Sequence, residues 1–248
     1  MSGSGVAGEV LGPNFDINVA LGKIDGISGT TRSGFNGDVG ATTEDVWPPS
    51  ILHVYLTSSE TMDITSDNAA DTGVGTGAQT LLISGVDDSF ISISETVTMN
   101  GVAGVTTVNS YLRINDMFVV TAGSGEANAG IITATATVAG TIQSQMIANA
   151  NSDSVFQFTI PAGLDGFLTN FQISVGSSDQ AVFSFFTRTE GGLFIELITQ
   201  EISNTGFSLQ ASPYLFVPEK SDFRCVAART SGAAISISAV AQLYLVEI

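Results

Sequence analysis

Strict alternation of apolar and polar side chains is the feature of this sequence that most limits its fold. In residues 235–246, six apolar side chains occupy every second position: Ile235, Ile237, Ala239, Ala241, Leu243 and Leu245. Residues 91–99 and 167–175 repeat the pattern. A period of two places apolar side chains on one face of a β-strand. Since no long stretch has the helical period of 3.6, we expect an all-β protein.

Turn signals separate these alternating stretches about every eight to twelve residues, a spacing typical of antiparallel sandwiches. They include Asn100-Gly101, Pro161 and Gly191-Gly192. With 44% hydrophobic residues among 248, the chain can bury a sizeable core. We therefore expect an antiparallel β-sandwich or jelly roll with an extended N-terminal arm.

The expected module covers residues 50–248. A turn at 138–140 is predicted to join strands over 131–137 and 141–147, so no flexible linker divides the module. The alternative is a pair of lobes divided near residue 150, where residues 149–153 form a polar loop.

Residues 1–49 are rich in Gly and Asp and end in Trp47-Pro48-Pro49. We expect an extended arm that is ordered by lying across its own domain or a neighbouring subunit, because such a segment cannot bury enough surface alone. Residues 15–21 are predicted to add a short edge strand. On this interpretation, deleting residues 1–49 leaves the sandwich folded.

The net charge of −17 and the scatter of only seven basic residues argue against nucleic-acid binding, which needs clustered Lys or Arg. The N-terminus lacks the features of a signal peptide, and no apolar run approaches the roughly 18 residues of a membrane span. We expect synthesis in the host cytoplasm and no membrane partner. The single cysteine, Cys225, is expected to be a buried core residue.

Catalytic and cofactor sites are not indicated. His53 is the only histidine, no G-x-S-x-G motif occurs, and the glycines of 73–77 have the spacing G-x-G-x-G without a following helix. A transition-metal cluster, a serine triad and a phosphate loop each need more than this. We expect no enzyme activity, no catalytic residue and no cofactor.

Two acidic clusters leave alternatives open: Asp63 with Asp67 and Asp71, and Asp87 with Asp88. Carboxylates in turns usually accept local backbone hydrogen bonds. The alternatives are that these carboxylates bind calcium or form the catalytic pair of a glycosidase. Phe183, Phe185 and Phe186 leave both faces of one strand apolar, which suits either a core or a subunit contact.

Several segments resemble a virion-associated protein that recurs in marine tailed phages. The similarity covers approximately residues 15 to 137 and rests on segments 21–26, 36–39, 44–47, 71–78, 83–87, 95–101, 112–113 and 128–130. Segments 158–163 and 218–222 resemble small β-sandwich modules of phage appendages. The resemblance implies a multi-copy particle component without an active site.

The hypothesis that follows is a non-enzymatic virion structural protein, a capsid decoration (cement) protein that stabilises the phage head. Its expected partners are the major capsid protein or other virion proteins and further copies of itself, as a homotrimer. The candidate interface residues, all in the arm, are the aromatic anchors and charged residues Phe15, Lys23, Arg32, Phe35 and Trp47. The alternatives are a tail or fibre component, and a carbohydrate-binding adhesin module. The only obvious platforms for a sugar are Trp47, Tyr55, Tyr111 and Tyr214, and we expect a core or packing role for each of them.

Overall fold

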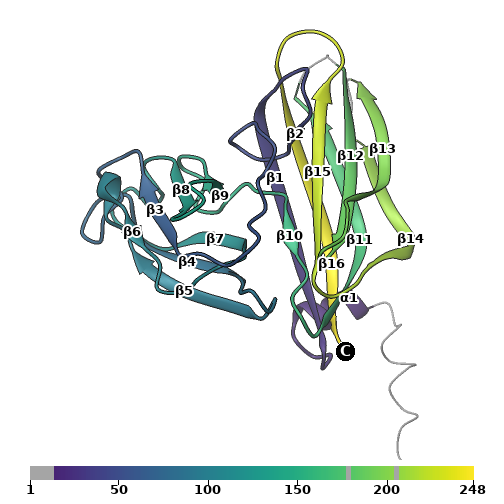
Figure 1. The fold of residues 1–248 in the computed structure, drawn as a ribbon, viewed down its shortest axis with the longest axis horizontal. Helices are drawn as coiled ribbons and strands as arrows, with labels where there is room; N and C mark the ends of the chain where they lie inside the picture. The colour runs from purple at the N-terminus through teal and green to yellow at the C-terminus, as the bar shows by residue number, and fades with distance from the viewer. Residues whose placement is uncertain (1–13, 177–179, 204–206) are drawn as a thin grey trace, which may run out of the picture.

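The protein consists of two β-lobes of unequal size, joined side by side (Figure 1). The structure is a computed structural model and describes residues 14–176, 180–203 and 207–248. Every paired strand in it is antiparallel. The prediction of an all-β, antiparallel protein is therefore confirmed.

The large lobe consists of two sheets stacked over one core. The first sheet has the order β1-β16-β11-β14, and the second has the order β10-β15-β12-β13 with β2 paired to β15. The strands are β1 (Ile27–Val39), β2 (Glu44–Asp45), β10 (Phe158–Thr159), β11 (Leu164–Val175), β12 (Gln180–Thr189), β13 (Ile195–Ser203), β14 (Phe207–Val217), β15 (Ser221–Arg229) and β16 (Ile235–Glu247).

Strand β1 corrects the interpretation of residues 1–49 as an arm. It pairs with β16 from Ile27 opposite Val246 to Val39 opposite Ile235, so it is an integral strand of the first sheet. The buried positions of its middle are Arg32, Gly34 and Asn36 rather than apolar residues, which explains why alternation did not reveal the strand. Residues 15–21, predicted as an edge strand, instead contain the short helix α1 (Phe15–Ala20).

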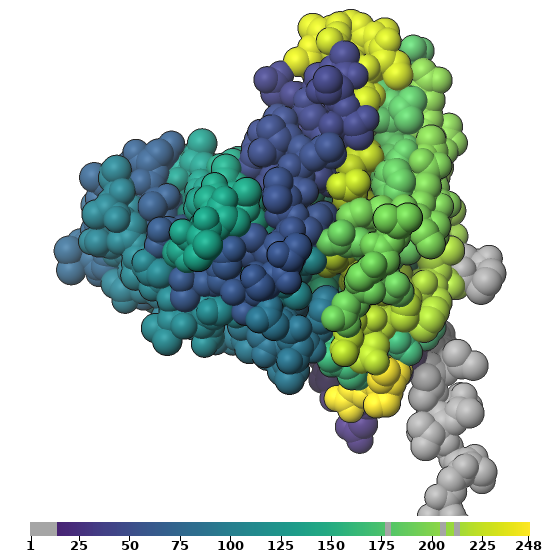
Figure 2. Space-filling model, viewed as in Figure 1, coloured from purple at the N-terminus to yellow at the C-terminus, as the bar shows by residue number. Residues whose placement is uncertain are grey.

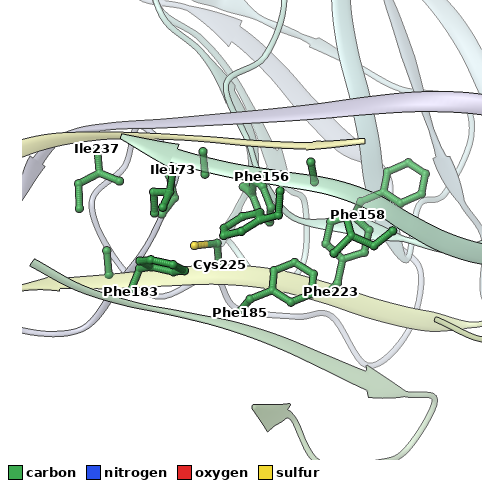
Figure 3. Close-up of a cluster of buried hydrophobic side chains, with 14 of the residues drawn as sticks. Phe156, Phe158, Ile173, Phe183, Phe185, Phe223, Cys225 and Ile237 are labelled. Atoms are coloured by element: carbon green, nitrogen blue, oxygen red, sulfur yellow. The ribbon is translucent and has the colours of Figure 1, made fainter. Parts of the chain in front are cut away.

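Phenylalanine dominates the core of the large lobe. Phe183 and Phe185 point from β12 toward Phe171 of β11, with ring centroids 5.6 and 5.4 Å away. Figure 3 shows this layer of rings between the two sheets, with Cys225 among them. Phe183 and Phe185 are wholly buried, so they belong to the core rather than to a subunit contact, and Cys225 is a buried core residue as predicted.

The small lobe is inserted between β2 and β10. It contains β3 (Met62–Ser66), β4 (Ala78–Val86), β5 (Ser92–Thr98), the 3₁₀ helix η1 (Gly101–Ala103), β6 (Val105–Thr106), β7 (Arg113–Ala122), β8 (Ile132–Ala136) and β9 (Ile142–Met146). These strands form the sheets β6-β3-β8-β9 and β5-β4-β7 over a core of their own.

The hairpin predicted around residues 138–140 is confirmed by the pairing of β8 with β9. The single module expected for residues 50–248 is instead split between two cores. Because β1 and β2 precede the insertion and the other strands follow it, the large lobe draws on both ends of the chain. Turn spacing could not reveal this, since the strands of both lobes have similar lengths and turns.

Candidate functional site

The junction of the two lobes holds the densest polar network of the described residues. Arg113, at the start of β7, donates through Nε and Nη2 to the two carboxylate oxygens of Asp222 on β15, at 3.1 and 3.2 Å. Arg188 Nε and Thr159 Oγ1 donate to the same carboxylate at 2.8 and 2.6 Å. Such bidentate, charge-assisted bonds are among the stronger polar contacts in proteins.

Further bonds fix the small lobe against this carboxylate. Arg113 Nη1 donates to the carbonyl oxygens of Leu56 and Leu112 at 2.8 and 2.7 Å. The Asn115 side chain donates to the Thr159 carbonyl and accepts the Thr159 N–H, both at 2.8 Å. Burial alone would raise the pKa of Asp222, but Arg113, Thr159 and Arg188 outweigh it and lower that pKa. The junction is thus a fixed contact with an ionised centre.

Arg32 makes a second connection between the lobes. Its Nη2 lies 3.3 Å from Asp153 Oδ1 and donates to the Val155 carbonyl at 2.9 Å, while Nη1 lies 3.4 Å from Asp116. Burial raises the pKa of Asp153 to about 6, against the opposing effect of Arg32. Only 5% of Arg32 is exposed, so this residue is committed to the chain itself and not to a shell protein.

Aromatic rings line the same junction. His53 packs edge-on between Trp47 and Tyr55, with centroids 4.9 and 4.6 Å away. The Arg188 guanidinium lies over the rings of Tyr55 and Phe194 at 4.2 and 4.4 Å, a favourable cation–π arrangement. Trp47 has no exposed surface, and its indole N–H donates to the Ile51 carbonyl at 2.7 Å. Trp47 thus packs inside the chain in this structure, and its role as an anchor for another protein stays a prediction.

The ionisable groups beside His53 do not resemble a catalytic set. Burial, and then the charge of Arg113, lowers the pKa of His53 to about 4. Burial raises the pKa of Asp45 to about 6, although its Oδ2 accepts the His53 backbone N–H at 2.7 Å. Within the described part of the chain, His53 Nδ1 has no hydrogen-bond partner, whereas a hydrogen bond with the Gln143 backbone acts to raise the His53 pKa. An open cavity of about 700 Å³ borders this network, between Tyr55, Arg113 and Asp222.

Most carboxylates of the two acidic clusters accept hydrogen bonds from backbone N–H groups. Asp71 accepts bonds from the N–H groups of Ala78, Ala129 and Gly130 at 2.7, 2.8 and 2.9 Å. Asp87 accepts from two nearby N–H groups in the turn after β4, and Asp88 accepts from Ser59 N–H. Among the described residues, no three His, Cys, Asp or Glu side chains are grouped so as to hold a metal ion. Asp87 makes the local turn contacts that the simpler interpretation predicted. Asp71 and Asp88 also bind backbone N–H groups that are distant in the sequence, and Asp63 accepts from the Thr106 hydroxyl.

One strand edge presents apolar side chains to solvent. Leu193, Ile195 and Leu197, here called the edge surface, are 86, 64 and 39% exposed. They lie on and just before β13, which pairs only with β12 and so ends its sheet. Open edge strands can pair with another chain, and proteins often protect them with charged residues, Pro or a bulge. Strand β13 contains no Lys or Pro, but it carries Glu196 and Glu201, and a bulge interrupts its pairing between Glu196 and Ile198. Sequence reasoning missed this surface because a pattern cannot separate exposed from buried apolar residues in one strand.

The remaining predicted interface residues lie at three separate places. The Phe15 ring packs 5.2 Å from that of Tyr244, Lys23 is exposed in the turn after α1, and half-buried Phe35 lies on the outer side of β1. With Arg32 and Trp47 inside the junction, the five residues do not form one surface.

Comparison with known proteins adds little. No protein-family model matches the chain, and no curated protein matches it. Solved structures with weak likeness include an empty virus-like particle of Cowpea Mosaic Virus, with 12% identity, coverage of 75% of this chain and 78% of that one, and a TM-score of 0.23. Infectious bursal disease virus strain Gt gives 11% identity, 89% and 72% coverage and a TM-score of 0.23. At these TM-scores, the similarity says nothing about the fold or the function of this chain.

Proposed function

We propose that this chain is a non-enzymatic virion structural protein that attaches to a phage head as a decoration (cement) protein. The observation that carries the proposal is the strand order of the large lobe. We number the eight strands of this lobe other than β2 from 1 to 8 along the chain. In these numbers, the two sheets have the strand orders 1-8-3-6 and 2-7-4-5. This is the order of a jelly roll, a fold frequent in viral capsid and lectin domains.

Since one fold hosts many functions, a second observation supports the proposal beside the strand order. The second support is the edge surface, where leucine and isoleucine are exposed at an open strand edge on a chain of net charge −17. Mutual repulsion keeps free acidic subunits apart, while apolar contact and strand pairing favour docking on a partner. The proposed partner is the major capsid protein, and the proposed oligomer is a homotrimer.

The junction supplies the rigidity that such a role requires. The small lobe projects from one side of the large lobe (Figures 1 and 2), and Arg113, Arg32 and their carboxylates hold it there. A protein that binds only the assembled lattice stabilises it by mass action, and a fixed shape reduces the entropy lost on docking. No helix among the described residues is long and apolar enough to cross a membrane.

The test is a binding titration against particles that lack the protein. The double variant Leu193→Ser, Ile195→Ser should bind at least tenfold more weakly. Val74→Ser, Val138→Ser is the matched control, because Val74 and Val138 are equally apolar and 96 and 85% exposed on the small lobe. Equal binding by the two variants would contradict the role of the edge surface.

Labelling of intact particles tests the location. Hundreds of copies spread over the shell would agree with decoration, whereas a few copies at one vertex would favour the alternative of a tail or fibre component. Absence from purified particles would contradict both.

A further inference from the structure

The outer face of the first sheet carries two unlike rows of side chains next to each other. Residues opposite one another in adjacent strands point to the same face of a sheet. One row is aromatic and runs over Tyr244, Phe167 and Phe216. The next row is polar and runs over Thr31, Gln242, Asn170 and Gln210, one residue from each of the four strands.

A bulge turns this face into a groove. Between the pairs Leu168–Leu215 and Asn170–Gln210, β14 uses residues 211–214 where β11 uses only Thr169. The groove of about 620 Å³ lies over this irregularity and under α1, within the usual range of roughly 300–1,000 Å³ for small-molecule sites. The Tyr214 ring lies 6.1 Å from that of Tyr244, at 63°, and Tyr214 is 49% exposed.

The amide groups of this groove have unused hydrogen-bonding capacity. Asn170 Nδ2 donates to Gln242 Oε1 at 3.4 Å, and Asn170 Oδ1 is buried without a partner among the described residues, so that oxygen is not accessible to a ligand in this conformation. Within the same part of the chain, the side-chain amides of Gln172 and Gln210 make no hydrogen bond, although both line the groove. An amide offers two donors and an acceptor, so these residues can bind groups that both donate and accept.

Charge narrows the ligand class. The lining contains one ionisable acid, Asp16, whose carboxylate accepts the Tyr244 hydroxyl, and no Lys or Arg. Phosphate, sulfate and carboxylate ligands would find no cation in this lining. A neutral ligand with many hydroxyl groups and apolar C–H faces fits the adjacent amide and aromatic rows.

We propose that this groove binds a neutral oligosaccharide, with Tyr214 and Tyr244 against the sugar rings and Gln242, Gln210 and Asn170 bonded to the hydroxyl groups. Aromatic rings supply large apolar contact area with a polar tip, and paired amides supply directional bonds. The site shares no residue with the edge surface, so it does not depend on the proposed attachment to a shell.

The test is to screen the full chain against an array of neutral oligosaccharides of glucose, galactose, mannose and N-acetylglucosamine, with sulfated and uronic-acid oligosaccharides as charged probes. The best neutral hexasaccharide is then titrated by calorimetry and by NMR of the Asn and Gln side-chain amides. We expect binding to at least one neutral probe, and shifts confined to amides of the groove.

Tyr214→Ala and Gln242→Ala should each weaken this binding at least tenfold. Phe35→Ala is the matched control, because Phe35 lies on the same outer face opposite Ser238, at the other end of the sheet; it should bind as the unmodified chain does. Tyr214→Phe, which keeps the ring, should lose less than Tyr214→Ala. Melting curves establish that each variant is folded.

Three results would overturn the proposal: no binding to any neutral probe at 10 mM, tighter binding of the charged probes, or loss of binding in Phe35→Ala as large as in Tyr214→Ala. The Leu193→Ser, Ile195→Ser variant separates this proposal from the previous one, since it should lose particle binding while retaining the sugar.

Discussion

Asp222 of the large lobe holds Arg113 of the small lobe through two hydrogen bonds at 3.1 and 3.2 Å. The two residues are 109 positions apart in the sequence. Both side chains are buried, with 8% of the Arg113 side chain and 6% of the Asp222 side chain exposed. Thr159 and Arg188 also donate hydrogen bonds to the Asp222 carboxylate, so this one carboxylate joins the two lobes.

Asp222→Asn should destabilise the chain by about 3–5 kcal/mol, because removing one partner leaves a buried charge uncompensated. Urea unfolding followed by tryptophan fluorescence measures this, as Trp47 lies at the junction. The control is Glu190→Gln, which removes an exposed pair with Lys220 at 3.9 Å and should cost less than about 1 kcal/mol. Similar losses in both variants would contradict a structural role for the junction.

His53 should make stability fall on acidification. Its pKa is about 4 in the folded chain against 6.5 ordinarily, so between these values the unfolded chain binds the proton and the folded chain does not. Asp45 and Asp153 act oppositely, since their folded pKa values of about 6 lie above 3.8 and the folded chain gains protons as pH falls from 6 toward 4. The opposing effects partly cancel in the unmodified chain.

His53→Gln removes one side of this balance. Relative to the unmodified chain, the variant should gain about 3 kcal/mol of stability between pH 7 and pH 4. The reason is that folding lowers the His53 pKa from 6.5 to about 4, and each tenfold change in proton affinity corresponds to about 1.36 kcal/mol. Free energies of unfolding in urea at pH 4, 5, 6 and 7 give the slope, and any packing loss from the substitution is the same at each pH. Parallel slopes for the two proteins would contradict a buried, neutral His53.

The sequence predicted those strands whose inner face is apolar. The alternation of residues 235–246 became β16, and the hairpin at 138–140 lies where it was expected. Strand β1 escaped because its inner face is built from Arg32, Gly34 and Asn36. Arg32 binds carboxylates of the small lobe, and Gly34 lies under Phe156. Asp153 and Phe156 are more than 100 positions away from these residues of β1, and no local pattern can express such contacts.

The candidate sites were even less predictable. Arg113 and Asp222 meet only because the chain inserts one lobe into another, and the groove depends on which residues face one another across β1, β16, β11 and β14. Among the four aromatic residues named as possible sugar platforms, the sequence did not distinguish Tyr214, and its neighbours Gln242 and Asn170 come from other strands. Register between distant strands is set by tertiary packing, so the sequence alone did not bring these residues together.

Gly34→Ala should destabilise the large lobe by about 2 kcal/mol or more, because overpacking a core usually costs about 1–3 kcal/mol and occasionally more. A Cβ at Gly34 would lie 2.4 Å from the Val46 carbonyl oxygen and 2.6 Å from Phe156 Cβ, where backbone has to move. Gly29→Ala in the same strand is the matched control, since its nearest atom is Val19 Cγ1 at 3.8 Å. Thermal melting of the two variants compares them, and an unchanged melting temperature for Gly34→Ala would contradict the close approach.

Truncation distinguishes a strand from an arm. Deleting residues 1–49 removes β1, β2 and the buried side chains of Val39, Val46 and Trp47. Because β16 then loses one of its two neighbouring strands along almost its whole length and keeps only β11, the large lobe should not fold. Deleting residues 1–26 is the matched control: of the described residues removed, only Val19 is buried, so the cost should be about 3 kcal/mol or less, the upper end for one buried aliphatic side chain. Proton NMR and urea unfolding measure both. If the chain lacking residues 1–49 keeps dispersed methyl resonances and a cooperative transition for the large lobe, β1 is dispensable, and residues 1–49 are the removable arm that their composition first suggested.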